Sequence, residues 1–167
     1  MIVVADSGPL HYLILLDHVG LLQRLYGSVA VPDAVAAELV STGAPDAVRA
    51  WVGQPPSWVQ VLPVASEALA AVTDDLDPGE RSAIALAEML HADLLLIDEA
   101  AGRAEAKRRH LRVTGTPGVL RAGAELGLVN VPDLIARLQA TTFYVDQARL
   151  ERGLPQPTPL EIVDVER

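Results

Sequence analysis

Near its start the chain reads Ile2-Val3-Val4-Ala5-Asp6-Ser7-Gly8-Pro9. The four apolar residues, rich in β-branched side chains, predict a buried strand, and the polar and turn-forming residues after them predict where it ends. A helix over 10–16 is expected next. A strand followed by a helix is the unit that, when repeated, builds a parallel sheet covered by helices.

The same alternation of strand and helix recurs along the chain. Further strands are predicted at 29–31, 58–64, 94–97 and 111–114. Further helices are predicted at 32–40, 47–52, 80–90, 99–109, 118–126, 132–139 and 146–152. Helices between parallel strands imply right-handed crossovers, so the fold class is α/β with three layers, the sheet lying between helices.

The composition suits one compact domain with an aliphatic core. The chain has 167 residues, of which 50% are hydrophobic but only 4% are aromatic. This amount of apolar sequence is enough for a sizeable core. We expect a domain over residues 1–152 and a tail or partner-binding arm over 153–167, where prolines recur at 155, 157 and 159.

Cysteine is absent, which excludes disulfides, thiolate metal sites and cysteine nucleophiles. The first residues lack the basic opening and long apolar core of a signal peptide, and no later apolar run approaches membrane-spanning length. The sequence therefore predicts a cytoplasmic protein with no membrane contact.

The net charge of −9 argues against a general nucleic-acid coat, because nonspecific affinity comes from Lys and Arg meeting phosphates. The basic residues are unevenly distributed, however. Six of the 13 fall in one short span: Arg103, Lys107, Arg108, Arg109, Arg112 and Arg121. A solvated helix face is the simpler interpretation, and contact with a phosphate backbone is the alternative if an active site lies nearby.

Four acidic residues stand where a parallel sheet would bring them to one edge. Asp6 and Asp98 each follow a predicted strand, Glu80 opens a helix that runs back along the sheet, and Glu38 lies inside a helix from which it must reach toward the edge. Gathered carboxylates repel one another unless a cation or protons neutralise them, so the pattern predicts a divalent-metal site.

Each acid also has a structural explanation. Asp6 and Asp98 are suitable helix caps, Glu80 is the third residue of an Asp77-Pro78-Gly79-Glu80 capping box, and Glu38 is a possible surface residue. The accessory candidates are Ser7, as a cap or a contact to water, and Glu99, as a ligand or a favourable charge in a first helical turn.

Three further positions are candidates for binding a phosphate group. Arg103 either contacts phosphate or pairs with Glu99 four residues earlier. Thr114 and Thr116 either present hydroxyls to a phosphate at a helix start or form a plain cap and turn. None of the four histidines has the spacing of a metal-ligand pair, and we assign none a catalytic role.

Five segments in their order resemble PIN-domain proteins, in particular the toxin ribonucleases of toxin–antitoxin pairs. They are Val3 to Leu10, Val31 to Glu38, Pro78 to Ala87, Leu95 to Glu99 with Gly102-Arg103, and Thr114 to Leu120. Asp6, Glu38, Glu80 and Asp98 fall on the acidic positions of that family. Gly8 and Leu96 depart from its pattern, since hydroxyl residues are frequent at both places.

The resemblance implies a five-stranded parallel sheet in the order 3-2-1-4-5. It also implies an endoribonuclease that uses Mg²⁺ or Mn²⁺, often as a homodimer, and that pairs with a small antitoxin protein. Asp6, Glu80 and Asp98 would then hold the metal and Glu38 would orient the attacking water, while Arg103 and Lys107 would contact RNA.

Two alternatives remain at this point. A phosphoacceptor receiver domain needs a lysine near the fifth strand, whereas the only lysine, Lys107, precedes that strand. A catalytically weak or inactive PIN-like module that acts by binding a partner keeps the same types of residue, and the sequence does not separate it from an enzyme.

Overall fold

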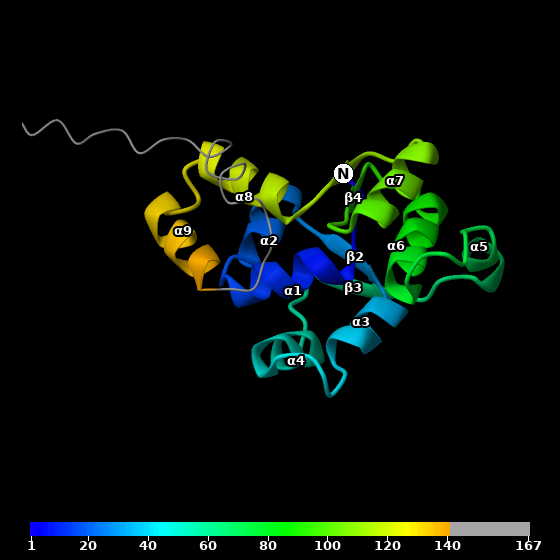
Figure 1. Ribbon diagram of the computed structural model, residues 1–167, viewed down its shortest axis with the longest axis horizontal. Helices are drawn as coiled ribbons and strands as arrows, with labels where there is room; N and C mark the ends of the chain where they lie inside the picture. The colour runs from blue at the N-terminus through cyan, green and yellow to red at the C-terminus, as the bar shows by residue number, and fades with distance from the viewer. Residues whose placement is uncertain (141–167) are drawn as a thin grey trace, which may run out of the picture.

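Five parallel strands form a single sheet in the computed structural model, which describes residues 1–140 (Figure 1). The strand order is β3-β2-β1-β4-β5, and every neighbouring pair is parallel. The strands are β1 (Val3–Ala5), β2 (Val29–Pro32), β3 (Val59–Leu62), β4 (Leu94–Leu96) and β5 (Val113–Thr114). The predicted α/β class and the order 3-2-1-4-5 are confirmed.

Helices connect the strands and cover the sheet. Within residues 1–140 they are α1 (Ser7–Leu15), α2 (Gly20–Tyr26), α3 (Asp33–Leu39), α4 (Asp46–Gly53), α5 (Ser66–Ala70), α6 (Pro78–Met89), α7 (Ala100–Arg108), α8 (Thr116–Glu125) and α9 (Val131–Gln139). Two of these, α2 and α5, were not predicted. The helix expected at 146–152 and the tail at 153–167 lie outside the described residues.

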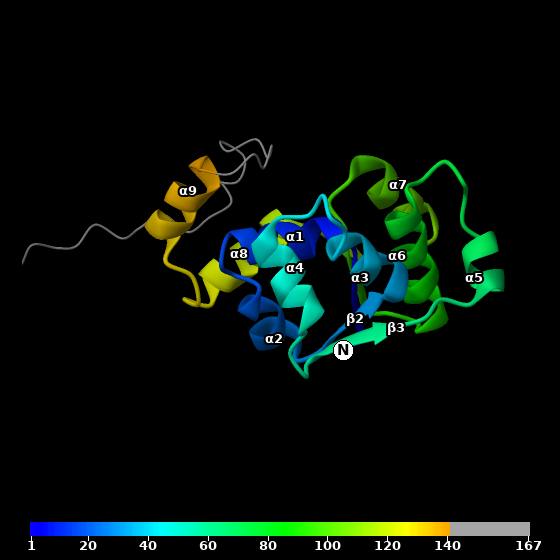
Figure 2. The same cartoon turned by 90° about the horizontal axis from the view of Figure 1, so that it is seen from below.

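The two faces of the sheet belong to separate hydrophobic clusters, as the alternation of side chains along a strand requires. Val3 and Ala5 join the cluster that contains the buried residues of α1, α2, α3, α4, α8 and α9. Val4, between them, joins the cluster built on α6 and α7. Figures 1 and 2 both show α6 and α7 grouped together, apart from α1, α2 and α8. The core therefore holds β1 from both sides.

The carboxyl ends of β1, β4 and β5 lie side by side. Ala5 pairs with Leu96, and the Asp6 N–H donates to the Leu96 carbonyl at 2.9 Å. The Ile97 N–H likewise donates to the Thr114 carbonyl at 2.8 Å. The chain leaves β1 toward β2 on one side and reaches β4 on the other, so this edge contains the switch point where parallel sheets bind ligands.

Helix α6 begins at the same edge. Asp77 is its N-cap, Pro78 occupies the first turn with a suitable φ, and Glu80 completes the predicted capping box. The helix is then almost entirely buried from Ser82 to Ala87. Because burial fixes the axis of α6, its first turn and Glu80 are held against the end of β1. None of the helices within residues 1–140 has the length and apolar character needed to cross a bilayer.

Candidate active site

Asp6 lies at the centre of the carboxyl edge, directly after β1. Its side chain is only 2% exposed, and Oδ1 has no hydrogen-bond partner among the described residues. Asp6 occupies the N-cap position of α1, but its side chain makes no capping hydrogen bond. A buried polar oxygen without a partner is energetically unfavourable, so capping does not explain this residue.

Glu80 divides its carboxylate between two tasks. Oε2 accepts a hydrogen bond from the backbone N–H of Asp77 at 3.2 Å, as the capping box predicts. Oε1 is buried without a partner, and the residue is 6% exposed. The structural explanation therefore accounts for one oxygen and leaves the other available to a ligand.

Glu38 reaches back from α3 to the start of α6, as its position required. A Cβ built on Gly79 would lie 2.7 Å from Glu38 Oε2 and 3.4 Å from Asp6 Oδ1. The carboxylates of Glu38 and Asp6 thus flank the same glycine. Glu38 itself is exposed, so the group nearest to solvent in the cluster belongs to α3.

Asp98 is held by the turn between β5 and α8. The backbone N–H of Thr116 donates to Oδ1 at 2.7 Å, and the Thr116 hydroxyl donates to Oδ2 at 2.6 Å. Asp98 was considered as a cap for the helix over 99–109, but the N-cap of α7 is Glu99. Asp98 instead caps α8, whose own N-cap is Gly115 and has no side chain to offer.

The acids disfavour one another's ionised forms. Burial raises the pKa of Asp6 to about 7, the Ser7 N–H opposes this, and the carboxylates of Glu80, Glu38 and Asp98 add to it. Burial also raises the pKa of Glu80 and of Asp98, with hydrogen bonds from Asp77 and from Thr116 opposing each shift. The backbone N–H of Gly102 also lowers the pKa of Glu80. It is near Oε1, but the geometry of the contact does not make a hydrogen bond.

These carboxylates fit a divalent cation by their chemistry. Mg²⁺ and Mn²⁺ prefer oxygen ligands, and Asp6 Oδ1 and Glu80 Oε1 are buried oxygens that nothing in the described chain satisfies. Within residues 1–140, no three Asp, Glu, His or Cys side chains form a complete metal site as they stand.

Of the predicted phosphate-binding residues, the structure brings Arg103 to the site. Its Nη1 donates to the Ile97 carbonyl at 2.8 Å, and its charge lowers the pKa of Asp98. The guanidinium is thus fixed to the backbone just before Asp98 and does not form the alternative pair with Glu99. Glu99 is exposed but close enough for its charge to raise the pKa of both Glu80 and Asp98.

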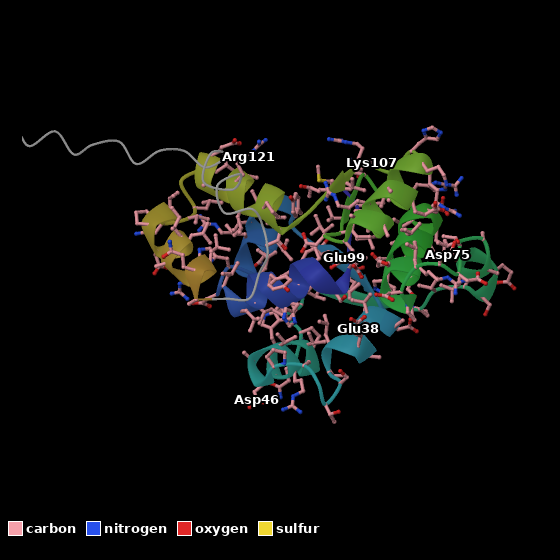
Figure 3. The ribbon with its side chains drawn as sticks, viewed as in Figure 1. Glu38, Asp46, Asp75, Glu99, Lys107 and Arg121 are labelled. Atoms are coloured by element: carbon pink, nitrogen blue, oxygen red, sulfur yellow. The ribbon has the colours of Figure 1, made fainter. Side chains whose placement is uncertain are left out.

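The other predicted contacts are placed differently. Figure 3 shows Lys107 at the outer end of α7, away from Glu38 and Glu99. Thr116 is fully buried and bonded to Asp98, so a contact with RNA would require its hydroxyl to leave that carboxylate. Thr114 is half-buried, with its hydroxyl against Gly118, and Ser7 is half-buried beside Asp6.

Three of the six residues of the basic span form ion pairs with glutamates, which favours the simpler interpretation of its sequence. Arg108 and Arg109 both bind Glu105, with nitrogen–oxygen distances of 2.7 Å. Arg109 also reaches Glu88 at 2.9 Å, and Arg121 lies 3.4 Å from Glu125. These guanidinium groups are therefore already paired with carboxylates.

The glycines that make room for the acids were not predicted from the sequence. A Cβ on Gly102 would lie 2.6 Å from Glu80 Oε1, and one on Gly115 would lie 2.5 Å from Asp98 Oδ1. Gly79 makes room for Glu38 in the same way. For three of the four carboxylates, a Cβ on a neighbouring glycine would therefore lie closer than 3.0 Å to a carboxylate oxygen. The available signal was Gly102, a glycine inside a helix where alanine is favoured by about 1 kcal/mol.

One histidine, His11, lies near the acids. Burial lowers its pKa, and the nearby carboxylate of Glu38 opposes that shift. These contacts do not test a catalytic role for His11, and the prediction that assigns it none is unchanged.

Comparison with known families agrees with this geometry. The family model described as "DUF3368: PIN domain" matches residues 2–157. A search of curated proteins found no significant match. PIN domains have a nuclease fold, commonly act on RNA and generally use divalent metal ions. With a sheet in the order 3-2-1-4-5, acidic residues gathered at its carboxyl edge and a match over most of its length, the chain belongs to the PIN-domain family.

Proposed function

We propose that the chain is an endoribonuclease that requires Mg²⁺ or Mn²⁺ and hydrolyses RNA phosphodiester bonds. The observation that carries the proposal is the pair of unsatisfied oxygens, Asp6 Oδ1 and Glu80 Oε1, on carboxylates that are more than nine-tenths buried. Two such groups at the ligand-binding edge of a nuclease fold are poorly explained by folding alone, because each destabilises the metal-free protein.

The residues have separate roles in this proposal. Asp6 and Glu80 hold the ion through their free oxygens, and Asp98 contributes from the neighbouring strand. Glu38, exposed and next to Asp6, orients the attacking water and accepts its proton. The ion, when bound, supplies positive charge and Lewis acidity at the phosphodiester. Water would add to phosphorus as it gives its proton to Glu38, the bond to the leaving oxygen would break, and that oxygen would take up a proton from solvent water.

Arg103 positions a phosphate of the RNA beside the ion. Its Nη1 is used in the bond to Ile97, and the guanidinium has five N–H donors in total, so the remaining donors can face an incoming phosphate. Lys107 and Thr114 remain predicted RNA contacts, and Lys107 is the more exposed of the two. Ser7 and Glu99 remain accessory candidates.

The biological role that we propose is that of a toxin, held in check by a small antitoxin and active as a homodimer in the cytoplasm. Support comes from the resemblance of the five sequence segments to toxin ribonucleases. Expression of the chain alone should arrest growth, and expression of the Asp6→Asn variant at equal level should not. Growth at the wild-type rate in both cultures would contradict the toxin role while leaving the nuclease chemistry open.

The nuclease proposal is tested with full-length protein purified under denaturing conditions, refolded, and freed of metal. We expect cleavage of RNA only after Mg²⁺ or Mn²⁺ is added, and loss of cleavage in Asp6→Asn. Asp75→Asn is the matched control, because Asp75 is an exposed aspartate away from Glu38 and Glu99 (Figure 3). Equal cleavage by wild type and Asp6→Asn would show that the active site lies elsewhere.

A second candidate function is a catalytically weak PIN-like module that acts by binding a partner. The observation that favours it is the lack of a complete set of three metal ligands within residues 1–140, with both oxygens of Asp98 already bonded to Thr116. In this case calorimetry would detect no Mn²⁺ binding to the refolded protein, and RNA would stay intact at any metal concentration.

A further inference from the structure

The four carboxylates differ in how firmly the protein holds them. Asp6 and Glu80 each keep one buried oxygen without a partner, whereas both oxygens of Asp98 accept a hydrogen bond from Thr116. These two bonds, at 2.7 and 2.6 Å, come from a single residue. Its backbone N–H binds one oxygen of the carboxylate and its hydroxyl binds the other. The Asp98 carboxylate is therefore fixed in rotation as well as in position.

The fold holds Thr116 in place, and so keeps its two hydrogen bonds to Asp98 in a fixed geometry. Thr116 is 0% exposed and is the first residue of α8, and one residue separates it from the end of β5. Pro117 follows it and fixes the backbone at the start of the helix. The chain just before Asp98 is joined to the same turn, because the Ile97 N–H donates to the Thr114 carbonyl at 2.8 Å. Thr116 and Asp98 therefore cannot shift independently.

Gly115, the residue before Thr116, leaves room for the Asp98 carboxylate. A Cβ on Gly115 would lie 2.5 Å from Asp98 Oδ1, 3.3 Å from the Ile97 carbonyl oxygen and 3.2 Å from Arg103 Nη1. Contacts below 3.0 Å force a displacement, so any side chain here would push the carboxylate or the guanidinium away. The turn fits Asp98 only with glycine at this place.

We propose that Thr116 is a positioning residue that presents Asp98 to the metal ion in one orientation. This inference rests on the proposed function and replaces the predicted contact of Thr116 with RNA. A carboxylate has about four lone-pair directions, of which Thr116 occupies two. The two hydrogen bonds fix the directions of the remaining two. Partners of this kind typically contribute a factor of 10–100 to metal affinity or activity.

The proposal is tested in the full chain by three substitutions. Thr116→Val keeps the shape and the backbone N–H but removes the hydroxyl, and Thr116→Ser keeps the hydroxyl. Ser82→Ala is the matched control, because Ser82 is also buried and its hydroxyl donates at 2.8 Å to the Pro78 carbonyl rather than to an acid. Mn²⁺ affinity is measured by calorimetry, and RNA cleavage is measured as kcat and KM separately.

We expect Thr116→Val to bind Mn²⁺ roughly 10- to 100-fold more weakly and to lose kcat, with KM for RNA unchanged. Thr116→Ser should stay within about threefold of the wild type, and Ser82→Ala should lower only thermal stability. A Thr116→Val variant that is folded and binds Mn²⁺ like the wild type would overturn the proposal, as would a folded Thr116→Ser variant that fails to restore binding.

The interaction between Thr116 and Asp98 is tested in the metal-free protein. The free energy of unfolding is measured for Thr116→Val, Asp98→Asn and the double variant, which together form a double-mutant cycle. The effects of the two substitutions should be clearly non-additive. Additive effects would overturn the proposal. If the wild type binds no Mn²⁺ and cleaves no RNA, the proposed function fails, and the role of Thr116 toward an ion fails with it. If the wild type binds Mn²⁺ and Thr116→Val does so equally well, only the role of Thr116 fails.

Discussion

Glu80 accepts the backbone N–H of Asp77 with one carboxylate oxygen and keeps the other buried and unpaired. One side chain thus both starts α6 and faces the acidic cluster. Capping needs only an acceptor atom at this position, whereas holding a cation needs negative charge. The two tasks can therefore be separated by substitution.

Glu80→Gln should preserve the fold and abolish function. Glutamine still accepts the Asp77 N–H as the third residue of a capping box, and the loss of charge relieves repulsion from neighbouring acids. We expect the free energy of unfolding of the metal-free protein to be equal or higher, and RNA cleavage to fall by about 100-fold or more. Urea unfolding and a cleavage assay check the two parts.

Glu80→Ala is the companion variant, because it removes the cap as well as the charge. Its free energy of unfolding should lie about 0.5–2 kcal/mol below that of Glu80→Gln. Equal stability of the two variants would show that the bond to Asp77 contributes nothing measurable to α6.

The stability of the metal-free protein should depend on pH through Asp6. Its pKa is about 7 in the folded chain against an ordinary value of 3.8, so between these values the folded protein keeps a proton that the unfolded chain has released. Stability from this group is therefore fully present below about pH 4, falls as pH rises toward 7, and is constant above that. The loss is on the order of a few kcal/mol.

Burial also raises the pKa of Glu80 and of Asp98, so the wild type is compared with Asp6→Asn by urea unfolding from pH 4.5 to 8. The difference between the two proteins isolates Asp6, and Asp6→Asn should gain relative stability as pH rises. Parallel curves would contradict the shifted pKa. Adding Mn²⁺ should reverse the trend in the wild type alone, because binding requires the ionised carboxylates.

Gly102→Ala should damage both the site and the core, although alanine is normally the better helix residue. The new Cβ would lie 2.5 Å from Ile97 Cδ1 and 2.6 Å from Glu80 Oε1. We expect a loss of roughly 1–3 kcal/mol in the free energy of unfolding, together with weaker Mn²⁺ binding. Thermal unfolding and calorimetry measure these effects.

Gly20→Ala is the control for this substitution, since Gly20 is also helical and a Cβ there meets nothing within 4 Å. It should be neutral or stabilise the protein by up to about 1 kcal/mol, with unchanged Mn²⁺ affinity. If both glycine variants behaved alike, the close approach of α7 to Glu80 would not be a constraint.

Arg103 and Lys107 should differ in their effect on RNA, although both were candidate contacts. Arg103→Met should lower kcat/KM by roughly tenfold if the guanidinium beside Asp98 contacts the cleaved phosphate, as we propose. Lys107→Met, at the outer end of α7, should change only the salt dependence of binding, by about one phosphate contact or less. Cleavage measured over a salt series separates the two, and a larger loss from Lys107→Met would reverse their assignment.

The sequence by itself determined the layered fold and the identity of the acids. The apolar run 2–5, with Val4 facing one cluster and Val3 and Ala5 the other, and the capping box at Asp77 are local signals that tertiary packing reinforced. Helices α2 and α5 escaped prediction because both are short, and α2 in addition depends on the packing of Leu21 and Leu22.

Only the tertiary structure decided what each polar group contacts. Asp98 caps α8 rather than the helix that follows it, Arg103 binds the Ile97 carbonyl rather than Glu99, and Thr116 faces a carboxylate rather than solvent. A hydrogen bond forms only when the donor and the acceptor are placed to within a few tenths of an ångström, and Asp98 and Thr116 are 18 positions apart in the sequence. The periodicity of a sequence specifies which face a residue occupies, but those distances are set by how the strands and helices pack.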